Sequence, residues 1–283
     1  YHMAASAIDE AVRNAVAVGA DPDRIAILDN FCWGNTDRPE TLGSLVRAAL
    51  ACHDVAVAWK TPFISGKDSL NNEFTWIDDQ GQKQSIAIPP SLLISAMGQV
   101  DDVARCVTMD CKQAGNPLYL VGDTRSEFGG SHLFQVLGIS GGEVPQVQTD
   151  RALQNFRFVH ESIRQGSIRA CHDLSEGGLA VAAAEMSFAG NLGIRIDLKH
   201  RQMNAMAVGM SEWLFSESNS RFLLEVDASR EDEFLAGAGD CFALRIGEVT
   251  DDDNFRVLRD GEPWLSIPWQ VLFEAWHRPL DWS

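Results

Sequence analysis

The order in which helical and strand patterns follow one another limits the folds open to this chain. Residues 6–19 place apolar side chains at helical spacing, and short apolar runs typical of buried strands occur at residues 24–28 and 92–98. Further on, strand patterns at residues 241–249 and 255–265 follow each other with no helix between them. Helices and strands are mixed rather than strictly alternating, which favours an α+β fold over a doubly wound sheet.

The chain divides into two predicted domains. A second helical pattern covers residues 39–57, and we expect a strand over residues 56–63. Residues 101–115 hold few apolar anchors and are the expected join. A length of 283 residues fits two domains of ordinary size. We place these domains at residues 1–100 and 115–283.

Charge excludes several classes of partner. The chain has 23 Lys and Arg against 40 Asp and Glu, a net charge of −17. Such a chain repels nucleic acid and anionic lipid, so neither is an expected partner. No apolar run approaches the ~20 residues of a membrane span. The six cysteines have no zinc-site spacing and are too few for a disulfide scaffold, and no signal peptide is apparent, so we expect a cytoplasmic protein.

Three segments in the first predicted domain carry polar side chains suited to a phosphate ligand or its metal ion. Glu10 and Asn14 share a helix face and could bind a hard cation, although a solvated face is the favoured reading of that pair alone. Asp29 follows a short strand, where an Asx turn is the favoured alternative. Gly66 and Lys67 precede Ser69 without forming a Walker A motif, and a ligand loop and a plain turn explain them equally well.

The second predicted domain has a richer segment at residues 171–179, CHDLSEGGL. Here a strand ends at Asp173, and a helix begins after Ser175 and a Gly-Gly pair. A helix N-terminus binds anions, and an adjacent Asp can hold Mg²⁺. Helix capping by Ser175 or Glu176 is the structural alternative, and the functional interpretation is favoured. A later polar loop holds Glu217 and Arg221, which could contact a ligand or pair with each other.

Six segments in this order resemble the second half of the phosphoribosylformylglycinamidine synthase family. They are AIDEAVRNAVAVGAD (7–21), ILDNFCWGN (27–35), FISGKDSLNNE (63–73), EFGGSHL (127–133), CHDLSEGGLAVAAAEM (171–186) and LFSESNSRFLLEV (214–226). The resemblance implies an N-type domain like that of aminoimidazole ribonucleotide (AIR) synthetase. This domain is truncated and lacks the leading strands. It is followed by an AIR synthetase-like C-type α/β sandwich domain.

The family reaction is the ATP-dependent amidation of formylglycinamide ribonucleotide in purine biosynthesis, with ammonia from glutamine. The resemblance places Asp29 and Gly66 at ATP contacts and Ser69 at a substrate contact. Lys67 stands where shorter family members have a Mg²⁺-binding Asn. Because an ammonium group cannot ligate a cation, a phosphate contact is the expected role of Lys67.

Longer family members also hold a second nucleotide, a structural ADP, that does not turn over. The resemblance implies that Glu10, Asn14 and Asp173 bind its Mg²⁺ and that Ser175 contacts the nucleotide. The expected cofactors are therefore Mg²⁺ and ATP or structural ADP.

The family's catalytic His loop belongs to its first half, so we expect no catalytic residue in this chain and no activity from it alone. The expected partners are that first half and a glutaminase domain or subunit. Self-association through unpaired strands is expected as well. Two alternatives remain: a non-catalytic nucleotide-binding scaffold, and a complete ATP enzyme of the AIR synthetase type. The latter carries an N-terminal glycine-rich phosphate loop, which is not seen here.

Overall fold

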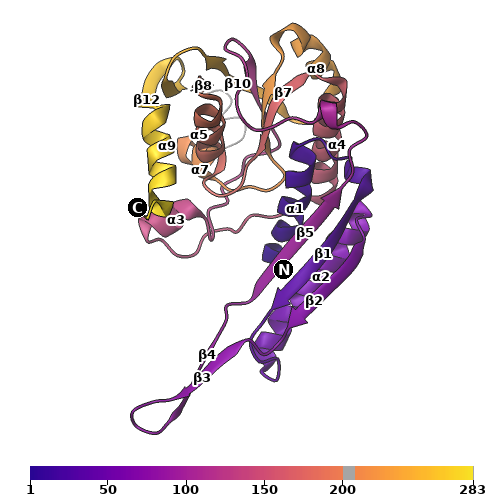
Figure 1. Ribbon diagram of the computed structural model, residues 1–283, viewed down its shortest axis with the longest axis vertical. Coiled ribbons are helices and arrows are strands. Elements are labelled where there is room, and N and C mark those ends of the chain that lie inside the picture. The colour runs from indigo at the N-terminus through magenta and orange to yellow at the C-terminus, as the bar shows by residue number, and fades with distance from the viewer. Residues whose placement is uncertain (200–207, 283) are drawn as a thin grey trace.

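The computed structural model describes residues 1–199 and 208–282. Its N-terminal part is a three-stranded sheet in the order β2-β1-β5, with two helices on one face (Figure 1). The elements of this part are α1 (His2–Ala17), β1 (Ile25–Cys32), α2 (Pro39–Trp59), β2 (Phe63–Ser69), β3 (Glu73–Ile77), β4 (Lys83–Ala87) and β5 (Ser91–Gly98). Strands β1 and β2 are parallel, and β5 runs antiparallel to β1. Strands β3 and β4 form a separate hairpin that projects away from the rest of the molecule.

The C-terminal part is a seven-stranded sheet in the order β12-β11-β8-β10-β6-β9-β7. Its strands are β6 (Pro117–Val121), β7 (Ile168–Asp173), β8 (Gly193–Leu198), β9 (Phe222–Val226), β10 (Ala243–Thr250), β11 (Asn254–Arg259) and β12 (Glu262–Pro268). Its helices are α3 (His132–Leu137), α4 (Thr149–Gln165), α5 (Gly178–Gly190), α7 (Met210–Phe215), α8 (Glu231–Gly237) and α9 (Trp269–His277). Single 3₁₀ turns lie at Pro22–Arg24, Val103–Arg105, Ala228–Arg230 and Arg278–Leu280. Mixed pairing and unevenly distributed helices confirm the predicted α+β class.

Strand β6 shows why this sheet is covered on both faces. All five of its residues are buried, as expected for a strand between two helical layers. Because successive side chains point to opposite faces, Leu118 and Leu120 join the core beneath α5, whereas Tyr119 and Val121 join the core beneath α4. Figure 1 shows these helices on opposite sides of the sheet.

The core beneath α4 continues into the N-terminal part. One hydrophobic cluster contains Ile8 and Val12 of α1 and Trp59 of α2 together with Phe156 of α4 and Phe222 of β9. The Trp59 and Phe156 rings meet edge to face at 5.2 Å between centroids, and the Trp59 indole N–H donates to the Thr149 carbonyl at 2.9 Å. The two parts therefore pack as one body, which fixes α1 against the C-terminal sheet.

The predicted strand at residues 56–63 is wrong, because α2 extends to Trp59 and β2 begins at Phe63. Val55 and Trp59 complete the buried face of the helix, and Lys60 ends it in a left-handed conformation. Of the described helices, α2 alone has the length and apolar composition that could cross a membrane. Its inner face is buried against this domain.

Candidate functional site

A cavity of about 120 Å³ lies where α1 meets three loops of the C-terminal part. One loop leads from β7 into α5, one precedes β9, and one lies between α3 and α4. The cavity is lined by Ser6, Glu10, Arg13, Pro145, Ser175, Glu176, Glu217 and Asn219. Segments more than 160 residues apart in the sequence thus form one polar pocket. A larger cavity, of about 780 Å³, lies at the start of α4 and contains none of the predicted site residues.

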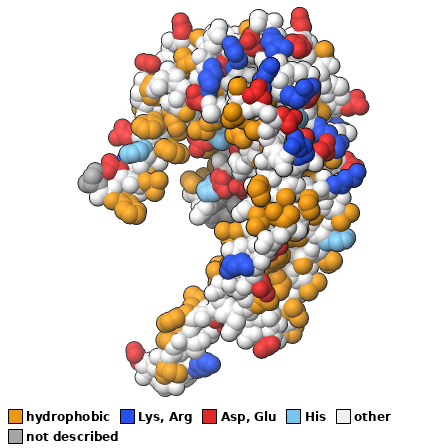
Figure 2. Space-filling model, turned by 45° about the vertical axis from the view of Figure 1, so that its right-hand side comes forward, with side chains coloured by type: hydrophobic (Ala, Val, Ile, Leu, Met, Phe, Trp, Pro, Cys, Tyr) orange, Lys and Arg blue, Asp and Glu red, His pale blue; other side chains and the backbone are white. Residues whose placement is uncertain are grey.

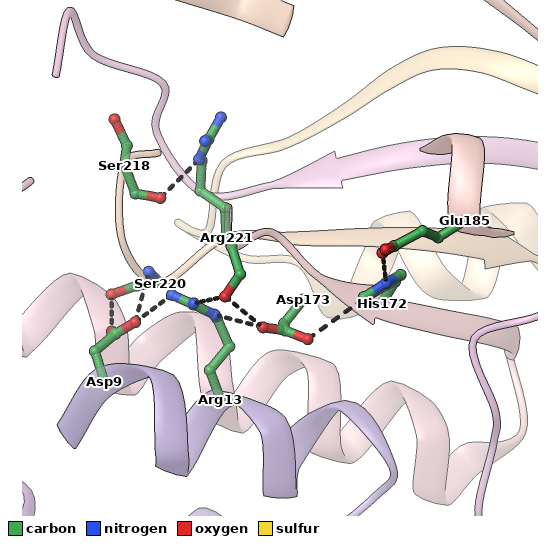
Figure 3. A network of polar contacts seen from close by, with 9 residues as sticks. Asp9, Arg13, His172, Asp173, Glu185, Ser218, Ser220 and Arg221 are labelled. Carbon is green, nitrogen blue, oxygen red and sulfur yellow. Dashed lines mark hydrogen bonds and ion pairs between the residues drawn. The ribbon is translucent and has the colours of Figure 1, made fainter. Parts of the chain in front are cut away.

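Arg13 of α1 connects the two parts beneath this pocket (Figure 3). Its guanidinium is almost fully buried and pairs with Asp9 one turn earlier and with Asp173 of β7 at 3.3 Å. It also donates to the Ser175 hydroxyl at 3.0 Å. Asp9 in turn accepts from the backbone N–H and the hydroxyl of Ser220. The result is a buried ion-pair network that crosses from α1 to the C-terminal sheet.

Asp173 is also bonded on its other side. Its Oδ1 lies 3.3 Å from Nδ1 of His172, whose Nε2 lies 2.8 Å from the Glu185 carboxylate of α5. Burial opposes the charge of His172, but the hydrogen bonds to Asp173 and Glu185 outweigh it and raise its pKa to about 9. Burial likewise opposes the charge of Asp173, yet the His172 hydrogen bond and the Arg13 charge lower its pKa to about 2.

The predicted Mg²⁺ ligands are not arranged as a metal site. Both oxygens of Asp173 are already bonded, to Arg13 and Ser175 on one side and to His172 on the other. Glu10 lines the cavity mouth, where partial burial and the Glu176 carboxylate raise its pKa, while Asn14 is exposed. Within residues 1–199 and 208–282, no three His, Cys, Asp or Glu side chains converge to hold a metal. The Arg13 guanidinium occupies the cation position beside Asp173, so the residues do not fit Mg²⁺ in this arrangement.

The start of α5 is held by Glu217 rather than by a local cap. Gly177 is the N-cap residue, and its N–H donates to the Glu217 carboxylate at 2.8 Å, so capping by Ser175 or Glu176, the structural alternative, does not occur. Gly178 has a φ of +63°, and a Cβ there would overlap the Ser216 carbonyl. Arg221 does not pair with Glu217 but is fully buried and donates to backbone and to Thr124.

A second polar group forms along the parallel pair β1 and β2. The register places Asp29 opposite Gly66, and Lys67 donates to the Ser69 hydroxyl at 3.1 Å. Both segments are strand, so the predicted Asx turn at Asp29 and the predicted loop at Gly66 are wrong. Burial and the Asp68 charge raise the pKa of Asp29 although the Lys67 N–H donates to it. The pairing places all four predicted ATP and substrate residues on neighbouring strands, with Asp29 and Gly66 on one face of the sheet and Lys67 and Ser69 on the other. None of them lines the cavity.

Gly66 is required by this close approach. A Cβ at residue 66 would overlap both carboxylate oxygens of Asp29. We expect Gly66→Ala to push the Asp29 side chain away and to destabilise the fold by roughly 1–3 kcal/mol, measured by urea unfolding. Ser65→Ala, at the exposed neighbouring position, is the matched control with a change near zero. If Gly66→Ala is as stable as Ser65→Ala, the close approach of Asp29 does not require glycine at residue 66.

Arg13, Asp9 and Ser220 are the site residues that sequence reasoning missed. A signal was present, because residues 9 and 13 lie one turn apart beside the apolar positions Ile8 and Val12. Two charged residues at the edge of a buried helix face imply a partner from elsewhere in the fold. The sequence does not say which partner.

Comparisons with known proteins agree with this architecture. The family model described as AIR synthase related protein, C-terminal domain, matches residues 113–260. The chain is 35% identical over 254 residues to the phosphoribosylformylglycinamidine synthase subunit PurL of Thermococcus sibiricus, covering 89% of this chain and 33% of that protein. The same subunit of Methanothrix thermoacetophila is 32% identical, covering 99% of this chain and 36% of that protein. The chain thus spans about a third of the length of these relatives.

Solved structures match the fold at low sequence identity. T. maritima PurL complexed with FGAR superposes with a TM-score of 0.71 at 17% identity, covering 95% of this chain and 42% of that chain. T. maritima PurL complexed with ATP gives 0.66 at 19% identity, covering 96% and 41%. HypE in the HypE–HypF complex gives 0.67 at 14% identity, covering 94% and 83%. The match confirms the predicted AIR synthetase-like fold.

Proposed function

This chain belongs to the family of AIR synthase related proteins, and from that membership we propose that it is one portion of a phosphoribosylformylglycinamidine synthase. The relatives that bear this name, at 32–36% identity, support the proposal. The proposed reaction of the whole enzyme is the ATP-dependent amidation of formylglycinamide ribonucleotide, a C–N ligation with ammonia derived from glutamine. The proposed domains of this portion are residues 1–100 and 115–283.

The observation that carries the proposal is the polar group on β1 and β2. Lys67 is exposed and offers a positive charge in a chain of net charge −17, where a phosphate otherwise meets repulsion. Gly66 is exposed, and its missing Cβ leaves room for the Asp29 carboxylate, so a nucleotide at this position would meet that carboxylate. Ser69 lies on the same face as Lys67, whereas Asp29 and Gly66 lie on the other face, so the group lies on both sides of the edge strand β2. In the proposal Lys67 holds an ATP phosphate, Asp29 and Gly66 contact ATP, and Ser69 contacts the substrate.

The missing two thirds of the enzyme are proposed to dock beside this group. Strand β2 is an edge of its sheet, and the sheet face opposite the helices exposes Ile64, Leu93 and Met97. Exposed apolar strands at a free edge are suited to pair with another sheet. We assign this surface to the synthase's first half, which supplies the catalytic residues, and we include a glutaminase domain or subunit as the ammonia source. We also propose that the enzyme is cytoplasmic.

The cavity above Arg13 is proposed as a second nucleotide site. Structures of T. maritima PurL complexed with ATP, ADP and AMPPCP support nucleotide binding within this fold. Ser175 faces the cavity and contacts the nucleotide in the proposal. Because Asp173 is bonded to Arg13 and His172, no step of the proposed function depends on Mg²⁺ held by Glu10, Asn14 and Asp173.

A kinetic comparison tests the proposal. The isolated chain is expected to release no ADP when supplied with ATP, formylglycinamide ribonucleotide and ammonia, because the catalytic residues lie elsewhere. In the full-length protein encoded by the same gene, Lys67→Ala is expected to raise KM for ATP about tenfold, the loss of one charged phosphate contact worth roughly 1.4 kcal/mol. Lys60→Ala, at the exposed C-terminal end of α2, is the matched control with unchanged KM.

Two outcomes would contradict it. Turnover by the isolated chain would show that it carries its own catalytic residues. Equal KM values for Lys67→Ala and Lys60→Ala would show that ATP does not contact β2.

A further inference from the structure

Arg13 is held by oxygen atoms of the kind that bind a metal ion. In Figure 2 Lys and Arg side chains gather on the outside of the upper part of the molecule, whereas Arg13 is 2% exposed. Its guanidinium lies between the carboxylates of Asp9 and Asp173 (Figure 3) and donates to the Ser175 hydroxyl at 3.0 Å. One or two carboxylates, with further oxygen ligands, are also what Mg²⁺ takes from a protein. The same oxygens therefore suit either cation.

The charge of these oxygens distinguishes Arg13 from Arg221, a second buried arginine nearby. Arg221 donates to two backbone carbonyls and to the Thr124 hydroxyl, all of which are neutral. Arg13 instead joins two buried carboxylates that come from different parts of the chain. Buried carboxylates are costly unless positive charge lies between them. The position of Arg13 therefore requires a cation, whichever group supplies it.

We propose that Arg13 permanently takes the place of a divalent cation where α1 meets the C-terminal part, and that its oxygen partners form a latent Mg²⁺ site. An arginine side chain does not lose its proton in a protein, so this junction is complete without metal. Mg²⁺ enters the position only when the guanidinium is removed. The inference depends neither on a nucleotide in the cavity nor on the proposed reaction.

The cavity supplies the space and the entry path that a metal ion needs. Arg13 lines this cavity of about 120 Å³ beside Ser175, and Glu10 adds a carboxylate to the lining. Truncation of Arg13 would join the volume of its side chain to the cavity and open the Asp9 and Asp173 carboxylates to water. A polar space of this size holds a few water molecules, and Mg²⁺ keeps several of its waters when it binds a protein. A hydrated ion thus fits where the guanidinium lies.

Hydrogen exchange of the α1 amides in the full-length protein encoded by the same gene tests the proposal. The buffers contain no nucleotide and have equal ionic strength, one with EDTA and one with about 10 mM MgCl₂. The unchanged protein is expected to exchange at the same rate in both. Arg13→Ala is expected to exchange faster in EDTA, and Mg²⁺ should slow that exchange about tenfold if its dissociation constant is about 1 mM. Because the readout is confined to α1, Mg²⁺ bound elsewhere in the enzyme does not affect it.

Two variants are the matched controls. Arg13→Met fills the vacated space, so its faster exchange in EDTA should not be slowed by Mg²⁺. Arg13→Ala combined with Asp9→Asn lacks one of the ligand carboxylates, so its response to Mg²⁺ should fall below about twofold.

Three outcomes would overturn the proposal. The first is slower α1 exchange of the unchanged protein in Mg²⁺, which would show that the metal binds beside Arg13. The second is an Arg13→Ala response no larger than that of either control variant. The third is an Arg13→Ala protein that stays unfolded even in Mg²⁺, because the metal would then not replace the arginine.

Discussion

Replacing Arg13 by methionine is expected to lower the free energy of unfolding by about 3–5 kcal/mol, because it leaves the buried Asp9 carboxylate without a cation and leaves Asp173 with His172 alone. Asp9 is fully buried, and the Asp173 side chain is 8% exposed. Both pair with the Arg13 guanidinium, which also bonds to Ser175. The methionine side chain fills a similar volume, so the loss measures the charge rather than a cavity. Urea denaturation monitored by tryptophan fluorescence gives the value.

An exposed arginine in a comparable ion pair is the matched control. Arg24 pairs with Asp101 at 2.6 Å, but both side chains are largely exposed. Arg24→Met is expected to change the free energy of unfolding by less than about 1 kcal/mol. Adding Asp9→Asn to Arg13→Met should recover part of the loss, since the uncompensated buried charge is removed. A cost for Arg13→Met no larger than that for Arg24→Met would show that the network does not hold the two parts together.

Stability is also expected to fall as the pH rises from about 6.5 to 9, through the titration of His172. Its folded-state pKa of about 9 lies above the ordinary value of 6.5, so the charged form is bound more tightly in the folded state. This contribution is fully present below pH 6.5 and is lost as the pH passes the folded value. A rise of this size corresponds to roughly 3 kcal/mol. The charged groups that face His172 are Asp173 on its own strand and Glu185 of α5, with Arg13 behind Asp173.

A variant of Glu185 separates this effect from the titration of other groups. Glu185→Gln keeps a hydrogen-bond acceptor for Nε2 but removes the charge. The pKa of His172 should then move toward its ordinary value, and the stability profile between pH 6.5 and 9 should flatten. NMR titration of the His172 ring measures the pKa, and urea unfolding at each pH measures stability. Identical profiles for Glu185→Gln and the unchanged chain would refute the explanation.

Local sequence patterns predicted most of the secondary structure. They did not predict where helix α2 ends and strand β2 begins, between residues 56 and 69. Helical spacing predicted α1 and most of α2, and the strand pattern at residues 255–265 falls on the hairpin β11–β12. Strand β2 was not predicted, because its sequence, FISGKDS, has few β-branched or aromatic residues. Pairing with β1 rather than local preference makes it a strand. The same pairing turned the predicted ligand loop into part of a sheet.

The sequence likewise predicted some residues of the candidate site but not their partners. Glu10 and Ser175 were predicted from separate motifs, and they do line one cavity, with Asp173 directly beneath. The proposed Mg²⁺ role of Asp173 depended on its oxygens being free. Arg13 binds one of them, and the local sequence around residue 173 does not indicate that an arginine from a helix 160 positions earlier will lie there.

By itself, the sequence determined the fold class, the family and the residue types able to bind a polyphosphate, since these follow from periodicity and from short motifs in order. Only the tertiary structure decided which charges meet. The electrostatic state of a buried carboxylate depends on neighbours within a few ångströms, and in this protein those neighbours come from α1, β7 and α5. Chain packing therefore placed a guanidinium beside Asp173, where the motif alone had suggested a metal ion.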